Sequence, residues 1–346
     1  MSASMETMLE LWASSLRDVK ARIRPLFTQA RVAASAGLFL DGLLGPERRK
    51  TGWVRAEAAG DPGPWRQQAI LGRGRWEADA LRDVVRDYAL ETLADPDAVL
   101  VIDETGFLKQ GRASCGVGRQ YTGSAGKITN CQIGVFAAYV SQHGHTFIDR
   151  ALYLPKAWTD DPARLAAAHV PADIGFATKP QLARRMVERA MASGVPFAWV
   201  TADTVYGVSE LEMALRHAGR GYVLGMPRTQ GVGSSGTRPD VSGTAEDVAS
   251  ALAPAAWQRL SAGAGTKGPR VYELGVCGAC PPRRPGPGLF RQPWPVDPRV
   301  ADPAQHRRRR VRVLRHVVPG WHGHRHAGRR RRSALGDRGQ LRDHQN

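Results

Sequence analysis

Apolar runs typical of strands alternate with helical patterns between residues 96 and 227, and this alternation constrains the fold most strongly. Three strand-like runs come first, in DAVLVIDETGFLK, CQIGVFAAYVS and TFIDRALYLPKAW. The helical patterns KPQLARRMVERAMASG and VSELEMALRHAG then alternate with the apolar runs PFAWVTADTVYG and GYVLGMP. Strands joined directly can pair antiparallel, whereas a helix between two strands favours parallel pairing. The pattern therefore predicts a mixed α/β sheet over residues 96–227.

The segment before this sheet, residues 1–95, has the three- and four-residue apolar spacing of amphipathic helices. The spacing is clearest in METMLELWASSLRDVKARIRPLF, ARVAASAGLFLDGLLG and RWEADALRDVVRDYALETL. Gly and Pro residues separate these pieces, as in a helix-turn-helix-like bundle. We predict an N-terminal helical domain, and both DNA contact and simple packing on the sheet remain open as its role.

Two further regions follow the predicted sheet. Residues 228–273 are rich in Gly, Ser, Thr and Pro and are interpreted as an insertion or linker, with one predicted helix in AEDVASALAPAAWQRL. Residues 274–346 hold 17 Arg and four Asp but no Lys or Glu. No apolar period persists in that stretch, so we predict a disordered Arg-rich tail that cannot bury a core.

The charge of the chain is concentrated in this tail. The net charge is +17, and 17 Arg minus four Asp gives the tail +13, which leaves only +4 for residues 1–273. Four cysteines are too few for a secreted disulfide framework. No run of about 18 apolar residues indicates a membrane span. We therefore expect a cytoplasmic protein with no membrane partner. The net charge by itself suggests a polyanionic partner, but the concentration of that charge in the tail changes the argument.

Two aspartates stand where chemistry is expected. Asp103 follows the apolar run AVLVI, and Asp203 follows PFAWVTA. Carboxylates at the ends of two strands of one sheet can converge on Mg²⁺, which prefers hard oxygen ligands. The alternative is that each Asp is a turn residue or a helix N-cap. Glu104 is a weaker candidate, because the strand period points it away from the face of Asp103.

Several separate segments resemble one known family. They are VLVIDETGFLKQGRASCGVGRQYTG, KITNCQIGVFAAYV, LYLPKAWTDDPAR, VPADIGFATKPQLARRMVERA and PFAWVTADTVYG. In order and spacing they are similar to the DDE superfamily transposases of actinobacterial insertion sequences, over roughly residues 8–273. The resemblance implies a ribonuclease H-like catalytic core behind a helical DNA-binding region. It also implies cutting and joining of double-stranded DNA at transposon ends, dependent on Mg²⁺ or Mn²⁺, in a synaptic complex of several copies.

The resemblance assigns roles to particular residues. Asp103 corresponds to the first catalytic acid and metal ligand, and Asp203 to the second. The family often has an acid where Thr204 stands, which puts little in doubt because Asp203 is adjacent. The family's third acid, a Glu on a downstream helix, has no counterpart here, so no third residue is nominated. We therefore predict an impaired enzyme, and the alternative is a non-catalytic DNA-binding protein that inhibits an intact transposase. An unrelated ribonuclease H-like nuclease ranks last.

The tail invites a separate hypothesis. Lys, Glu and apolar periodicity all disappear after Leu274, as happens when GC-rich coding DNA is translated in the wrong frame, and we favour this explanation over a genuine arm that binds nucleic acid. Cys277 and Cys280 have the spacing of half a zinc site. Without a second pair this pattern is weak, so we do not expect zinc there, even with the alternating His322, His324 and His326 nearby.

Four basic residues are candidates for contact with DNA phosphates: Lys179, Arg112, Arg119 and Lys127. Lys179 precedes a predicted helix, and the other three lie in a Gly-rich segment after the first catalytic strand. A hairpin with exposed basic residues beside the active site would grip a phosphate backbone. The alternative for Lys179 is a solvated side chain at a helix start.

Three tryptophans lie in the helical segment, Trp53, Trp65 and Trp76. Tryptophan can stack on bases, but it more often fills a core because its ring buries a large apolar area. We therefore expect these three side chains to be packed in the interior.

Overall fold

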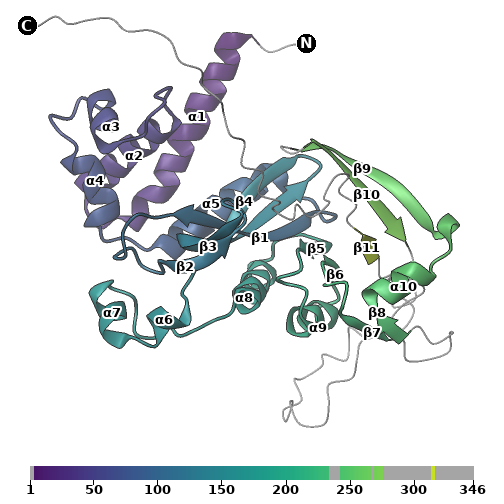
Figure 1. Cartoon of the computed structure of the whole chain (residues 1–346). Coiled ribbons are helices and arrows are strands. Elements are labelled where there is room, and N and C mark those ends of the chain that lie inside the picture. Colours follow the sequence, from purple (N-terminus) through teal and green to yellow (C-terminus); the bar gives the residue numbers. More distant parts are fainter. Residues whose placement is uncertain (1–3, 234–241, 266–267, 276–312, 316–346) are drawn as a thin grey trace, which may run out of the picture.

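The computed structural model describes residues 4–233, 242–265, 268–275 and 313–315. Figure 1 shows an N-terminal group of helices, a central sheet with helices beside it, and a smaller β-rich part that follows in the chain. The hypotheses about Cys277, Cys280 and the tail histidines lie outside the described residues, and the idea of a changed reading frame stays a prediction.

The central sheet has the order β4–β3–β1–β5–β6, with β2 also paired to β3. Its first three long strands are antiparallel: β1 (Val99–Leu108), β3 (Lys127–Ser141) and β4 (Gly144–Tyr153). Strands β5 (Trp199–Ala202) and β6 (Gly221–Leu224) continue the sheet in parallel with β1. Strand β2 (Gly118–Thr122) forms a hairpin with the start of β3. The predicted ribonuclease H-like mixed sheet is confirmed.

One face of the sheet is covered by the helices that connect its parallel strands. Helix α8 (Lys179–Ala192) precedes β5, and α9 (Ser209–His217) joins β5 to β6. Leu100 and Ile102 of β1 are almost fully buried against Met186 of α8 and Leu211 of α9. Side chains alternate between the two faces of a strand, so this burial defines the covered face. Each such side chain contributes about 1.5–3 kcal/mol to stability.

Aromatic side chains lie on the opposite face of the sheet. Phe107, Phe136 and Phe147 form a row across β1, β3 and β4, with ring centroids 6.4 Å and 5.3 Å apart. Phe107 is 47% exposed and Phe147 is 64% exposed. Asp103 pairs with Phe136 across the ladder, so this aromatic row shares the face of the first candidate metal ligand.

The N-terminal segment is helical, as predicted. Its helices are α1 (Met5–Ile23), α2 (Ala30–Leu44), α3 (Gly52–Ala58), α4 (Trp65–Gly72) and α5 (Ala78–Leu93). Phe27, Ala36 and Ile70 form a small core of their own. Helix α5 instead packs along β4, and its Leu90 and Leu93 contact the core of the sheet.

The three tryptophans of this segment differ in their surroundings. Trp76 packs 6.2 Å from the Phe27 ring and donates a hydrogen bond to the Ile70 carbonyl, as expected for a core residue. Trp53 and Trp65 lie 6.3 Å apart and are 63% and 60% exposed. The expectation of core packing is therefore wrong for these two, because the rings pack against each other at the surface of α3 and α4 and not in the core of the helical segment.

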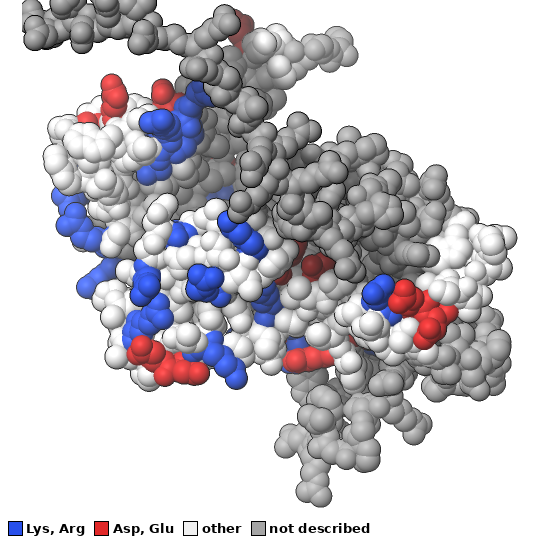
Figure 2. All heavy atoms as spheres, viewed as in Figure 1, with Lys and Arg blue, Asp and Glu red and all other residues white. Residues whose placement is uncertain are grey.

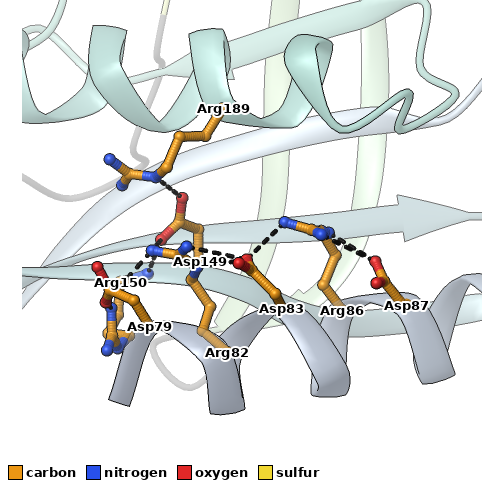
Figure 3. Close-up of polar contacts among 8 residues, drawn as sticks. All are labelled: Asp79, Arg82, Asp83, Arg86, Asp87, Asp149, Arg150 and Arg189. Atoms are coloured by element: carbon orange, nitrogen blue, oxygen red, sulfur yellow. Dashed lines mark hydrogen bonds and ion pairs between the residues drawn. The ribbon is translucent and has the colours of Figure 1, made fainter. Parts of the chain in front are cut away.

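A network of charged residues joins α5, β4 and α8 across the covered face (Figure 3). Asp149 of β4 is only 7% exposed; it lies 2.9 Å from Nε of Arg189 on α8 and 3.7 Å from a guanidinium nitrogen of Arg82 on α5. Further ion pairs extend the network to Asp79, Asp83, Arg86, Asp87 and Arg150. The network ties α5 to the sheet by charge as well as by apolar packing.

Two short helices follow β4, α6 (Lys156–Thr159) and α7 (Pro162–Ala167). Trp158 of α6 is buried with Val117 and Leu154, and its indole N–H donates to the Val117 carbonyl at 2.7 Å. These contacts pack the segment between β1 and β2 against α6 and the residue that follows β4.

The segment after β6 is mainly strand. It contains β7 (Gly231–Gly233), β8 (Ser242–Thr244), α10 (Ala245–Ala251), β9 (Trp257–Gly265) and β10 (Gly268–Gly275), and β10 also pairs with β11 (Val313–Arg315). The predicted helix in AEDVASALAPAAWQRL is wrong in its second half, because α10 ends before Pro254 and the chain continues as β9. Proline cannot continue a helix without losing a backbone hydrogen bond.

Two general expectations concern the described residues as a whole. Within the described ranges, no helix combines the length and the apolar character needed to cross a membrane. Cys115 and Cys131 are both free thiols.

Candidate active site

The parallel ladder between β1 and β5 brings Asp103 and Asp203 together. Its last residue pair is Ile102 with Ala202, so the two aspartates follow at equivalent positions of neighbouring strands. Parallel strands lie about 4.8 Å apart. Leu100, Ile102 and Val200 point to the covered face, so alternation places both aspartates on the opposite face. Both side chains are exposed.

The turn after Asp203 holds that carboxylate by its own backbone. One carboxylate oxygen of Asp203 accepts the Val205 N–H at 2.9 Å, and the Asp203 carbonyl accepts the Tyr206 N–H at 3.2 Å. Gly207 and Gly225 pack closely here, since a Cβ on Gly207 would lie 1.8 Å from the Gly225 carbonyl oxygen. The sequence needs glycine at Gly207 because the two backbone segments approach too closely for any side chain.

Asp103 carries an unfavourable charge in this arrangement. Although Asp103 is accessible to solvent, the residues packed around it partly desolvate its carboxylate and raise its pKa above the ordinary value, and the nearby charges of Asp203 and Glu104 raise the pKa further. The Glu104 N–H, which donates to the Asp103 carboxylate at 2.8 Å, and the Lys179 ammonium oppose this rise in pKa. Two carboxylates that repel each other on an accessible face are well suited to a cation that would relieve the repulsion.

Glu104 lies on the covered side of β1, next to the aspartate pair. Its two carboxylate oxygens bind different partners: the Lys179 ammonium lies 2.6 Å from one, and the Tyr206 hydroxyl donates to the other at 2.5 Å. Lys179 begins α8, whose N-cap Thr178 forms a capping box with Gln181. The prediction that Glu104 points away from the face of Asp103 agrees with this arrangement.

The four predicted DNA-contacting residues occupy different places. Lys179 is at the site through Glu104. Arg119 and Lys127 are exposed on the β2–β3 hairpin, and Arg112 is exposed in the segment before it. Arg119 pairs with Asn130, six positions along β3 from the Phe136 that faces Asp103, which corresponds to about 20 Å. Their contact with DNA stays a prediction.

Basic side chains dominate the part of the surface around β2, β3, α6 and α7. Figure 2 shows Lys and Arg spread over this region, with fewer acidic side chains among them. Three of the residues predicted to contact DNA are exposed in this part of the chain: Arg112, Arg119 and Lys127. A surface of this kind suits a phosphate backbone.

The donor set of Asp103 and Asp203 fits a hard divalent cation. Each aspartate uses one oxygen for a backbone N–H, which leaves carboxylate oxygen available to a metal that prefers oxygen ligands. In the described part of the chain, no group of three or more His, Cys, Asp or Glu could hold a metal ion. Asp103 and Asp203 are therefore the candidate acidic ligands among the described residues.

Residues 22–259 match the family described as DDE superfamily endonuclease, which is more than half of the chain. The chain belongs to the DDE superfamily of endonucleases. This family requires a divalent metal. The predicted family resemblance is thereby confirmed.

This DDE chain is also similar to a relative from Microchaete diplosiphon. That relative is named "Probable transposase for insertion sequence element IS701", and it is 31% identical over 141 residues. The alignment covers 40% of this chain and 34% of the relative. The DDE chain described here thus spans about a third of the length of the relative it matches.

The contribution of Tyr206 to the site was not anticipated from the sequence. Tyr206 is fully buried, and its partner Glu104 is 102 positions away in the chain. The only signal is that Glu104 continues the buried alternation of Leu100 and Ile102, which requires a polar partner for its carboxylate. Nothing in the TADTVYG segment itself indicates that Tyr206 is this partner.

Proposed function

We propose that this chain is a transposase that cuts DNA and joins DNA strands at the ends of an insertion sequence. Asp103 and Asp203 are its ligands for Mg²⁺ or Mn²⁺. The observation that carries the proposal is their placement directly after the last pair of the β1–β5 ladder, on the same accessible face. Membership of the DDE superfamily and the name of the IS701 relative support it.

The chemistry follows from the two carboxylates. Bound divalent cations activate a water or a 3′-hydroxyl and stabilise the leaving oxygen in phosphodiester chemistry. Asp103 and Asp203 hold such cations by charge and by fixed backbone geometry. Without cations, two negative side chains would repel a DNA phosphate, so these residues favour DNA only in the metal-loaded state.

Double-stranded DNA is the proposed partner. Arg119 and Lys127 on the β2–β3 hairpin and Arg112 in the segment before it would hold its phosphate backbone, away from the reacting bond. The helices of residues 1–95 are proposed to hold the transposon end, and several copies of the chain would assemble in a synaptic complex. Phosphate contacts of this kind position a duplex without reading its sequence.

We propose further that catalysis is impaired in this chain. The third acid that the family resemblance leads us to expect has no counterpart in residues 274–346, which contain no Glu, and loss of one metal ligand commonly costs orders of magnitude in activity. The test is Mg²⁺-dependent nicking and joining of DNA that carries the terminal repeats. We expect weak activity that disappears in Asp103→Asn and in Asp203→Asn. Activity equal to that of an intact relative would refute the impairment, and activity retained in both variants would refute the site.

A second candidate function is DNA binding without cleavage, in which the chain occupies transposon ends and inhibits an intact transposase. The absence of any Glu in residues 274–346 that could serve as the third acid favours it. Under this alternative, wild type and Asp103→Asn bind terminal-repeat DNA equally in a gel-shift assay, and neither cleaves it. Cleavage by the wild type alone would exclude it.

A further inference from the structure

Glu104 connects three separate segments of the chain beside the candidate metal ligands. Lys179 reaches it from the first turn of α8, and Tyr206 reaches it from the turn after β5. The two partners bind different oxygens of the same carboxylate, at 2.6 Å and 2.5 Å. Glu104 is therefore held by two partners, and a shift of its carboxylate would move the first turn of α8 and the turn after β5.

The surroundings of this contact are largely closed to solvent. Tyr206 is fully buried, and the side chains of Glu104 and Lys179 are 20% and 18% exposed. Burial raises the pKa of Tyr206 well above its ordinary value, with the hydrogen bond to Glu104 acting in the same direction. The hydroxyl is therefore a donor at any physiological pH. A buried carboxylate is stable only with such partners.

The contact acts on both aspartates through the backbone. Tyr206 donates its N–H to the carbonyl of Asp203, so the hydroxyl of Tyr206 anchors the turn that carries Asp203. Glu104 donates its own N–H to the carboxylate of Asp103. A displacement of Glu104 or Tyr206 would thus change the position of one aspartate relative to the other.

We propose that Glu104, Tyr206 and Lys179 form a positioning bridge that sets the separation of Asp103 and Asp203 for a shared divalent cation. The inference rests on the proposed metal site. Glu104 acts through its neighbours and does not bind the cation, because it faces the covered side of the sheet with both oxygens engaged. Lys179 neutralises Glu104, so the bridge adds no net charge beside the aspartates.

The experiment is a titration of the full chain with Mn²⁺, in which electron paramagnetic resonance measures the free ion. Tyr206→Phe removes only the hydroxyl and is expected to weaken Mn²⁺ binding about tenfold, the lower range for the loss of a residue that orients a metal ligand. Tyr222→Phe is the matched control. The Tyr222 hydroxyl also binds a carboxylate, Glu212, at 2.9 Å, but on β6 and α9, so Mn²⁺ affinity should stay unchanged.

Thermal unfolding of both variants separates positioning from general stability. The bridge is supported if both variants lose similar thermal stability and only Tyr206→Phe loses Mn²⁺ affinity. It is overturned if Tyr206→Phe binds Mn²⁺ like the wild type, or if Tyr222→Phe weakens binding equally.

Substitutions of Glu104 keep the test decisive if Tyr206→Phe does not fold. Glu104→Gln retains an acceptor for Tyr206 and loses the charge and the oxygen that face Lys179, so it should weaken Mn²⁺ binding less than Glu104→Ala, which loses both acceptors. Equal affinities in these two variants would overturn the bridge. Asp103→Asn identifies the source of a failure. If it leaves Mn²⁺ binding intact, the metal site itself fails and the bridge with it. If it abolishes binding while Tyr206→Phe does not, only the bridge fails.

Discussion

Asp149→Asn is expected to destabilise the fold measurably, because Asp149 is the buried centre of the charged network in Figure 3. The carboxylate is 7% exposed, and its oxygens bind Nε of Arg189 at 2.9 Å and the Arg150 N–H at 2.7 Å. Arg82 adds a longer contact of 3.7 Å. Asparagine keeps the size of the side chain and an oxygen for the Arg150 N–H, so the variant removes the negative charge and the oxygen that accepts from Arg189.

The magnitude follows from what each arginine retains. Loss of one partner of a fully buried pair costs about 3–5 kcal/mol, but Arg82 keeps Asp83 at 2.9 Å and Asp79 at 3.3 Å. Arg189 is 37% exposed and is screened by solvent. A hydrogen bond to a charged group contributes about 1.5–3 kcal/mol, so we expect a loss of about 1.5–2 kcal/mol. At about 2–4 °C per kcal/mol, the melting temperature should fall by about 3–8 °C.

The assay is thermal unfolding followed by far-ultraviolet circular dichroism, with Asp87→Asn as the matched control. Asp87 also binds an arginine of α5, Arg86 at 2.9 Å, but it is 63% exposed. An exposed pair contributes about 0–1 kcal/mol, so the control should melt within about 2 °C of the wild type. If the two variants melt at the same temperature, the argument that Asp149 fastens α5 and α8 to β4 is wrong.

Three other changes test the site and the core. Gly207→Ala places a Cβ 1.8 Å from the Gly225 carbonyl oxygen, so it should lower the free energy of unfolding by about 1–3 kcal/mol and weaken Mn²⁺ binding. Gly111→Ala has open space around its Cβ and should change neither quantity in the same unfolding and titration assays. In EDTA at pH 7, Asp103→Asn should melt at a higher temperature than the wild type, because a raised pKa in the folded state means that ionisation of Asp103 opposes folding. The difference in melting temperature should shrink as the pH falls through the raised pKa and vanish below the ordinary value of 3.8. Tyr139→Phe removes a fully buried hydroxyl that bonds the backbone of Asp95 and the Pro196 carbonyl, so urea unfolding should show a loss of about 1–3 kcal/mol, and a neutral result would contradict the burial argument.

The strands that carry the aspartates could be predicted because their pattern is local. Apolar runs that end in an acid reveal β1 and β5 without knowledge of their neighbours, and the alternation of Leu100 and Ile102 also places Glu104 on the covered face. The partners of Glu104 could not be predicted in this way. Lys179 and Tyr206 are 75 and 102 positions away, and only the three-dimensional arrangement of α8 and the β5 turn brings them to one carboxylate.

The errors of prediction have equally local causes. The segment around Trp257 has residues compatible with a helix, but proline at position 254 cannot continue the hydrogen bonds of a helix, and the chain pairs as strand β9 with β10 instead. Trp53 and Trp65 were expected inside because large rings usually are, yet both rings are more than half exposed and lie beside each other at the surface. Burial depends on what packs against a helix, and sequence patterns describe only the helix itself.

The short ladder between β1 and β5 has a consequence for how such chains can diverge. Four residue pairs, from Val99–Trp199 to Ile102–Ala202, decide that Asp203 arrives beside Asp103. The long connection between the two aspartates can gain or lose residues in its loops without moving either carboxylate, because loop length costs little free energy. A slip of one residue in this ladder would instead turn Asp203 toward the covered face. Insertions between β1 and β5 should therefore be common among functional relatives, whereas the pairing of these two strands should tolerate none.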